Sequence, residues 1–432
     1  MSTFVFLIVA IFIIGYACIA LEAFTKVNKA AVALLMCVLC WTVYCLIPGH
    51  DLTTLPEGLG ETAETLFFLM GAMTIVEIVD ANGGFNFVRD TMKTRSKRKL
   101  LWRVAFMTFF LSAILDNLTT SIVMIMVLRK LIQDNHERII YASLVIIAAN
   151  SGGAFSPIGD VTTIMLWIKG MVSTGGVISE LFIPSLVSIV VPTFLLSLTL
   201  KGKFDKAQNL KVAEVSIFTK HQRQVVFCFG VGGLIFVPIF KTVTHLPPYM
   251  GILLVLGLLW TITEVFNRQY EESDPMAKRV TQLLTRIDMS TILFFLGILM
   301  AVLCLKQVGV LNAMGDGLNV AFNGNPYLIT GIIGVLSSIV DNVPLVAACM
   351  NMYDVVPDTI YAVDGSFWQL LAYCAGVGGS MLIIGSAAGV VVMGLEKITF
   401  GWYMKKISWI VFVGYVAGIV VYWLEKALIF TA

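Results

Sequence analysis

Long apolar runs separated by short polar linkers make up most of the chain. Eight of the runs approach the roughly 20 residues that a helix needs to cross the hydrocarbon core of a bilayer. They lie near Phe4–Leu21, Ala30–Ile47, Thr65–Val79, Leu181–Leu200, Val225–Phe240, Met250–Phe266, Thr291–Val308 and Ile407–Leu424. This pattern predicts an all-α polytopic membrane protein embedded in a lipid bilayer.

Four other apolar segments are longer and are interrupted by polar residues, glycine or proline. They are Leu101–Leu131, Ile139–Lys169, Tyr327–Met352 and Phe367–Leu395. As one straight helix the first would be about 46 Å long, against a hydrocarbon core of about 30 Å. We therefore expect it to fold back as a hairpin near "DNLTT", and the third segment to fold back near Asp341.

Charge is distributed unevenly between the two sides of the predicted membrane. The chain is 58% hydrophobic and 13% charged, and 25 of its 29 lysines and arginines fall in alternate linkers. Because basic linkers mark the cytoplasmic side, both termini are predicted outside. Basic residues flank Leu101–Leu131 on both sides, which predicts a re-entrant hairpin from the cytoplasm, whereas Tyr327–Met352 would be a re-entrant hairpin from the outside.

An internal repeat relates the two halves of the sequence. "SAILDN" at Ser112–Asn117 matches "SSIVDN" at Ser337–Asn342 with an offset of 225 residues. "GGAFSPIG" matches "GGSMLIIG" at an offset of 226, and Trp41 matches Trp260 at 219. The flanking charges of matching spans are opposite, which predicts two repeats of inverted topology.

The predicted domains follow from this repeat. An N-terminal repeat covers 1–200, with its hairpin at 101–131 and its broken helix at 139–169. A cytoplasmic linker covers 201–224, and the inverted C-terminal repeat covers 225–432, with its hairpin at 327–352 and its broken helix at 367–395. Inverted repeats with broken helices are typical of secondary transporters, whose sites lie where the repeats meet.

Two carboxylates occupy equivalent tips of the predicted hairpins. A charge at the centre of a bilayer costs at least about 2.5 kcal/mol, so Asp116 and Asp341 are functional candidates. Each could instead cap a helix or close a turn at the tip. The breaks at 148–163 and 375–389 expose backbone groups that must line a cavity, or they kink the helices for close packing.

Together these segments supply side chains that nearly all donate oxygen atoms. The candidates are Asp116, Asn117, Thr119, Asn150, Ser151, Asp160, Thr162, Thr163, Ser337, Asp341, Asn342, Ser380 and Ser386. Hard cations prefer oxygen ligands, so the predicted substrate is a small cation, held near the three aspartates. Burial disfavours a charged carboxylate, so a proton can compete with the cation for the same group.

Other membrane charges are secondary candidates. Glu64 and Glu77 fit interfacial or interhelical hydrogen bonds, and Lys306 would pair with an acid or extend to the interface. The sequence contains no nucleotide-binding loop, hydrolase signature or second CxxC beside Cys37–Cys40. We therefore expect no enzyme activity, no cofactor, and no nucleotide or nucleic-acid partner.

The motifs "LDNLTTS", "NSGGAFSPIGDVTT", "VDNVPLVAA" and "GGSMLIIGSAAG" resemble those of the NhaD-type sodium/proton antiporters of the ion transporter superfamily. The resemblance implies exchange of Na⁺ or Li⁺ for H⁺, with a scaffold domain and a transport domain that moves like an elevator. It also implies a homodimer in the bacterial cytoplasmic membrane. The alternative is a sodium-coupled dicarboxylate carrier, or an arsenite or other anion carrier, of the same superfamily.

Overall fold

The computed structural model describes residues 3–20, 22–49, 52–92, 94–200, 202, 204, 218–268 and 279–428. Within these residues every regular element is a helix and there is no β-strand. Six of the described helices are long and apolar enough to cross a membrane: α4, α10, α11, α12, α14 and α21. The prediction of an all-α polytopic membrane protein is therefore confirmed.

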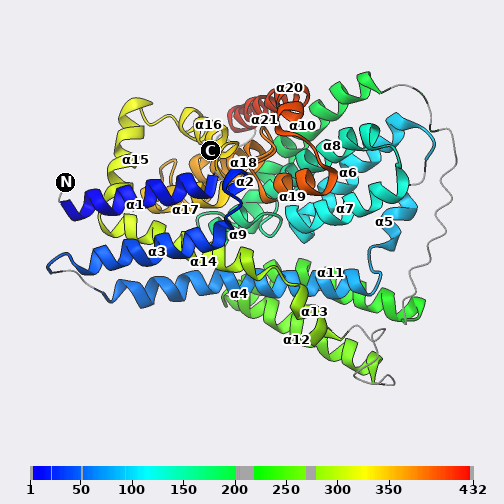
Figure 1. Ribbon diagram of the computed structural model, residues 1–432, viewed down its shortest axis with the longest axis horizontal. Coiled ribbons are helices and arrows are strands. Elements are labelled where there is room, and N and C mark those ends of the chain that lie inside the picture. Colours follow the sequence, from blue (N-terminus) through cyan, green and yellow to red (C-terminus); the bar gives the residue numbers. More distant parts are fainter. Residues whose placement is uncertain are drawn as a thin grey trace.

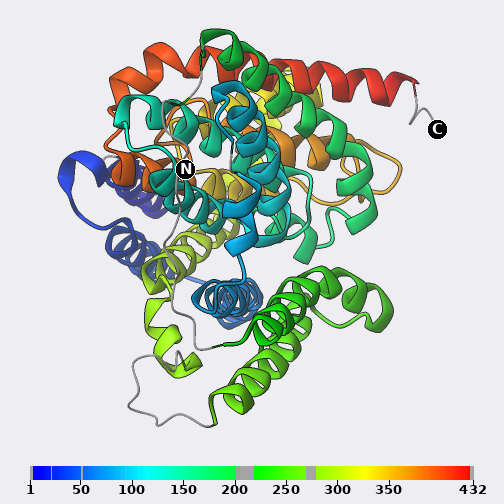
Figure 2. The same ribbon diagram turned by 90° about the vertical axis from the view of Figure 1, so that its right-hand side faces the viewer.

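Six helices form one layer, which we call the framework layer. In Figure 1 most of this layer fills the lower part of the molecule, and Figure 2 shows α4, α11 and α12 again at one side. Its helices pack in sequence, α1 on α3, α3 on α14, α14 on α4, and α4 on α11 and α12. They are α1 (Thr3–Ala20), α3 (Lys29–Cys45), α4 (Thr54–Ala81), α11 (Lys220–Thr244), α12 (Pro248–Asn267) and α14 (Met289–Gln307).

The four interrupted segments gather in a second layer with two continuous helices, and we call it the broken-helix layer. It occupies the upper part of Figure 1. Its centre is α8, which packs against α6, α7, α10, α18 and α19. Its members are α6 (Lys97–Leu115), α7 (Asn117–Leu131), α8 (Asn135–Ala154), α9 (Val161–Ile168), α10 (Thr174–Thr199), α16 (Pro326–Ser337), α17 (Asn342–Met352), α18 (Ser366–Gly378), α19 (Ala387–Glu396) and α21 (Ser408–Leu428).

Short helices lie along the chain between the helices of these layers. They are α2 (Glu22–Thr25), α5 (Asn86–Thr91), α13 (Val280–Leu283), η1 (Leu284–Arg286), α15 (Val310–Ala321) and α20 (Phe400–Lys406). Of these, α15 lies between two predicted apolar segments, Thr291–Val308 and Tyr327–Met352, where the sequence pattern predicted no helix.

All four predicted breaks are present. Asp116 ends α6 and begins α7, with φ at 82°, a backbone conformation that non-glycine residues rarely adopt. The second tip has no helix between Ser337 and Asn342. In the broken helices, the helical structure stops at Ala154 and resumes at Val161, and it stops at Gly378 and resumes at Ala387. Polar side chains at these points compete with the helix for backbone hydrogen bonds, and glycine disfavours a continuous helix, so the breaks fall where the sequence indicated.

The starts of three spans were predicted too late. Helix α4 begins at Thr54, not Thr65, because Pro56 lies in its first turn, where a proline removes no helical hydrogen bond. Helix α10 begins at Thr174, capped by the Ser173 side chain, and it continues through Pro184 and Pro192. In the predicted linker, α11 already begins at Lys220, and residues 205–217 lie outside the described part of the chain.

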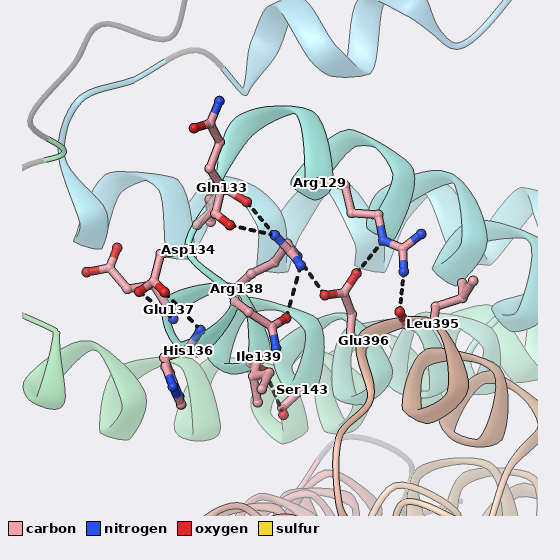
Figure 3. Close-up of polar contacts among 12 residues, drawn as sticks. Arg129, Gln133, Asp134, His136, Glu137, Arg138, Ile139, Ser143, Leu395 and Glu396 are labelled. Atoms are coloured by element: carbon pink, nitrogen blue, oxygen red, sulfur yellow. Dashed lines mark hydrogen bonds and ion pairs between the residues drawn. The ribbon is translucent and has the colours of Figure 1, made fainter.

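A buried carboxylate ties the end of α19 to α7 and α8. Figure 3 shows the Arg129 and Arg138 side chains converging on Glu396. The Arg129 Nε lies 2.7 Å from Glu396 Oε1, and the Arg138 Nε lies 2.6 Å from Oε2. Because the Glu396 side chain has no exposed surface, the two guanidinium groups supply the counter-charge that its burial requires.

Candidate ion-binding site

The four breaks meet through one network of side-chain hydrogen bonds. Asn117, at the start of α7, donates from Nδ2 to Asn150 Oδ1 on α8 at 3.0 Å and to Asp160 Oδ2 at 3.0 Å. From the second half of the chain, Asn342 Nδ2 lies 3.4 Å from the same Asp160 oxygen. The first hairpin tip, the second hairpin tip and the first broken helix thus share one carboxylate.

Asn150 extends this network to the second broken helix. Its Nδ2 donates to Ser380 Oγ at 2.8 Å and to Ser386 Oγ at 2.9 Å, although those serines are more than 200 residues away in sequence. All three side chains are buried. The amide therefore fixes the two breaks relative to one another.

Asp160 is the buried charge of the network. It precedes α9 and caps it, with Oδ1 accepting from the Thr162 backbone N–H at 3.2 Å. Asp160 is 1% exposed, and it takes part in none of the ion pairs in the described part of the chain. A buried carboxylate without a counter-ion is costly, which favours the uptake of a proton or a cation at this point.

Asp116 is turned toward its own helix. Its Oδ1 accepts from the Thr119 backbone N–H at 2.7 Å, and its Oδ2 accepts from the Thr119 hydroxyl at 2.8 Å. Asp116 and Asp341 are near enough to Asp160 for their charges to act on it. The helix-capping interpretation of Asp116 is therefore correct, and it leaves the carboxylate beside the network.

One predicted serine and one predicted threonine bond to the backbone. Ser337 Oγ donates to the Ala375 carbonyl at 2.8 Å, and the equivalent Ser112 Oγ donates to the Ala149 carbonyl at 2.6 Å. Thr163 Oγ1 donates to the Asp160 carbonyl at 2.9 Å. A further predicted serine, Ser151, accepts from the Ser188 hydroxyl of α10 at 2.9 Å.

Asp341 has a partner that the sequence did not suggest. The Lys29 Nζ lies 2.8 Å from its Oδ2, across from α3 of the framework layer. Lys29 stands in a basic linker that indicated only membrane orientation. Its position as the first residue of a helix opposite a tip aspartate became visible only in three dimensions.

The secondary candidates lie outside the network. Glu77 pairs with Arg286 at 3.2 Å, and Glu64 is near enough to Lys241 for their charges to interact. Lys306 lines a separate cavity of about 350 Å³ together with Glu61 and Asp354. These three residues therefore have local partners or surroundings of their own.

The described residues contain no group of three His, Cys, Asp or Glu side chains placed to hold a metal ion. A cation in the network would thus depend on amide, hydroxyl and carbonyl oxygens as well as carboxylates. That ligand set suits a weakly held alkali cation better than a resident transition metal.

The known proteins to which this chain is similar are named as transporters or antiporters. The citrate transporter family, CitMHS, matches residues 16–368. Sodium/proton antiporter 1 of Arabidopsis thaliana is 49% identical over 415 residues, covering 95% of this chain and 71% of that protein. Sodium/proton antiporter 2 of the same plant is 45% identical, covering 95% and 97%. The Na⁺/H⁺ antiporter NhaD of Alkalimonas amylolytica is 31% identical, covering 98% and 91%.

Proposed function

Since the chain belongs to the citrate transporter family and, within it, groups with the NhaD-type sodium/proton antiporters, we propose that it exchanges Na⁺ or Li⁺ for H⁺. The protein is a multi-span membrane transporter and not an enzyme. Exchange would be secondary active transport, in which the gradient of one ion drives the movement of the other.

The observation that carries this proposal is the isolated charge of Asp160. It is buried, it accepts from amide groups of both hairpin tips and from the backbone of the first broken helix, and it has no counter-ion within the described residues. A proton and a small cation each neutralise such a carboxylate, so they compete for it. In the proposed cycle, a proton displaces the cation on one side, and a cation displaces the proton on the other.

The two layers support an elevator mechanism. The broken-helix layer holds the network, and the framework layer packs beside it mainly through α17 on α14, α9 on α4 and α6 on α11. In the proposal, α6–α7 and α16–α17 are re-entrant hairpins of two inverted repeats, and they carry the ion across as one body. The matching Ser112 and Ser337 hydrogen bonds support the repeat.

The proposal keeps a homodimer and a bacterial cytoplasmic membrane, with both termini outside. Bacterial NhaD relatives support this location, and the basic linkers support the orientation.

Reconstituted vesicles provide the test. Adding Na⁺ or Li⁺ to vesicles with an imposed pH gradient should dissipate the gradient, and Asp160→Asn or Asp116→Asn should abolish this response. Asp316→Asn, which removes an exposed carboxylate of α15, should exchange normally. Full exchange in the Asp160→Asn protein would refute the assigned role.

A second candidate is an anion carrier, such as a dicarboxylate or arsenite carrier, because the family is described as one of citrate transporters. The network contains the Asp160 carboxylate, and the nearby Asp341 is paired with Lys29. An anion site would need free donors or positive charge. Anion uptake without cation-driven proton movement in the same vesicles would favour this alternative.

A further inference from the structure

The second hairpin tip is held by a cation that belongs to the protein itself. Lys29 Nζ lies 2.8 Å from Asp341 Oδ2, and the two side chains are only 23% and 15% exposed. The equivalent carboxylate of the first tip, Asp116, forms no ion pair with any described residue, and its oxygens accept from Thr119. The two tips, alike in sequence, therefore differ in charge.

Contacts within the framework layer position the lysine. Lys29 is the first residue of α3, and its backbone N–H donates to Glu22 Oε1 at 3.1 Å. Its ammonium group lies 4.3 Å from the centroid of the Phe294 ring of α14, close enough for a cation–π contact. The side chain is thus directed at Asp341 by α2, α3 and α14 together.

The repeat shows that this lysine belongs to one half alone. The offset of 219 that pairs Trp41 with Trp260 pairs Lys29 with Pro248. These two residues are also the first residues of the corresponding helices, α3 and α12. A proline carries no charge, so the first tip has no ammonium group from the matching position.

We propose that the Lys29 ammonium is a built-in competitor of the transported cation at Asp341. It neutralises the second tip while the first tip and Asp160 remain open, and it leaves Asp341 when the broken-helix layer moves or when a cation takes its place. This inference rests on the proposed function, because it assigns Lys29 a role in the binding of the same substrate.

The surroundings contain groups that fit both states of this switch. Glu22 on α2 and Asp288 at the start of α14 act on Lys29 with their charges. Tyr16 of α1 has a buried hydroxyl without a hydrogen-bond partner among the described residues, near enough to Asp341 to interact with its charge. The hydroxyl is thus a second polar group of the framework layer close to the tip when a cation displaces the lysine.

Equilibrium binding of ²²Na⁺ to the purified full-length protein in nanodiscs tests the proposal. In Lys29→Gln, Na⁺ should bind about fivefold more tightly than in the wild type, since a part-buried ion pair no longer competes. Lys29→Arg should bind like the wild type or more weakly. Lys26→Gln, which removes one exposed charge from the same linker, should not change binding.

The increase in Na⁺ affinity should disappear in the double variant Lys29→Gln/Asp341→Asn. That result would show that the increase arises at the second tip. Unchanged or weaker Na⁺ binding in the folded Lys29→Gln protein would overturn the proposal.

Thermal unfolding without Na⁺ separates this outcome from a failure of the proposed function. If the ion pair is formed, Lys29→Gln should lower the Tm in the wild type more than in Asp341→Asn. Wild-type protein that neither binds nor exchanges Na⁺ would refute the proposed function, whereas wild-type binding with no change in Lys29→Gln would refute only the competitor. Additive Tm changes would also overturn the competitor, because the pair would then not exist.

Discussion

At the scale of single residues, Asn150 is a side chain that connects the two halves of the network. Its Oδ1 accepts from Asn117, and its Nδ2 donates to Ser380 and Ser386. An amide can donate and accept at once, which neither a carboxylate nor an ammonium group can do. This explains why an uncharged residue lies between polar groups of both halves.

We predict that Asn150→Ala lowers Na⁺/H⁺ exchange at least about tenfold, because the loss of a buried hydrogen-bond partner costs about 1–3 kcal/mol. Proton flux in vesicles is the measurement. Ser143→Ala on the same helix is the control, since its hydroxyl bonds only to the Ile139 carbonyl. Exchange at the wild-type rate in Asn150→Ala would show that the bridge has no part in ion binding.

At the scale of elements, the broken helices cross their neighbours at glycine. A Cβ atom at Gly152 would lie 2.1 Å from the Phe109 carbonyl oxygen, and one at Gly378 would lie 2.2 Å from the Gly334 carbonyl oxygen. Both glycines and both carbonyls match under the sequence repeat. Each half thus uses the same backbone contact, between α8 and α6 and between α18 and α16.

The crossing predicts a difference between two glycine-to-alanine variants. Gly378→Ala should destabilise the protein by about 1–3 kcal/mol, because the rigid backbone cannot make room for the methyl group. Gly394→Ala in α19 should be neutral or slightly stabilising, since its Cβ meets open space and alanine favours a helix. Thermal unfolding in detergent measures both, and equal melting temperatures would contradict the close crossing.

At the scale of the whole molecule, lysines supply several of the polar contacts between the layers. Lys29 reaches Asp341, Lys169 at the end of α9 pairs with Glu61 of α4, and Lys241 of α11 donates to the Trp167 carbonyl at 2.6 Å. Among the described residues, these three polar contacts are ones that would break when one layer slides past the other. The arrangement suits the proposed elevator movement.

A covalent link between the layers should therefore stop transport. We predict that joining Glu61→Cys to Lys169→Cys with a short bifunctional thiol reagent abolishes exchange, and that each single variant keeps it after the same treatment. The two native side chains are 62% and 37% exposed, so the reagent can reach both positions. Normal exchange by the fully linked protein would exclude a movement of α9 along α4.

The positions of the helices and breaks were largely predictable from the sequence, but contacts within the site were not. The interruption at Asp116 has a local signal in the sequence, a polar pair inside an apolar run, and the structure confirms the break there. The pairing of Asn150 with Ser380 has no local signal, because it depends on how α8 packs against the second broken helix. Lys29 was missed for the same reason, since its distance from Asp341 is set by the docking of α3.

The sequence by itself determined an all-helical membrane protein with four broken segments and acidic tips. Lipid offers no hydrogen bonds, so apolar runs must form helices and polar interruptions must mark protected breaks. Only the tertiary structure decided which of the similar aspartates carries a counter-ion. Asp341 meets the Lys29 ammonium, while Asp160 is buried with amide and backbone donors alone. The environment of a charge depends on side chains brought together from distant helices, and spacing along the chain does not specify them.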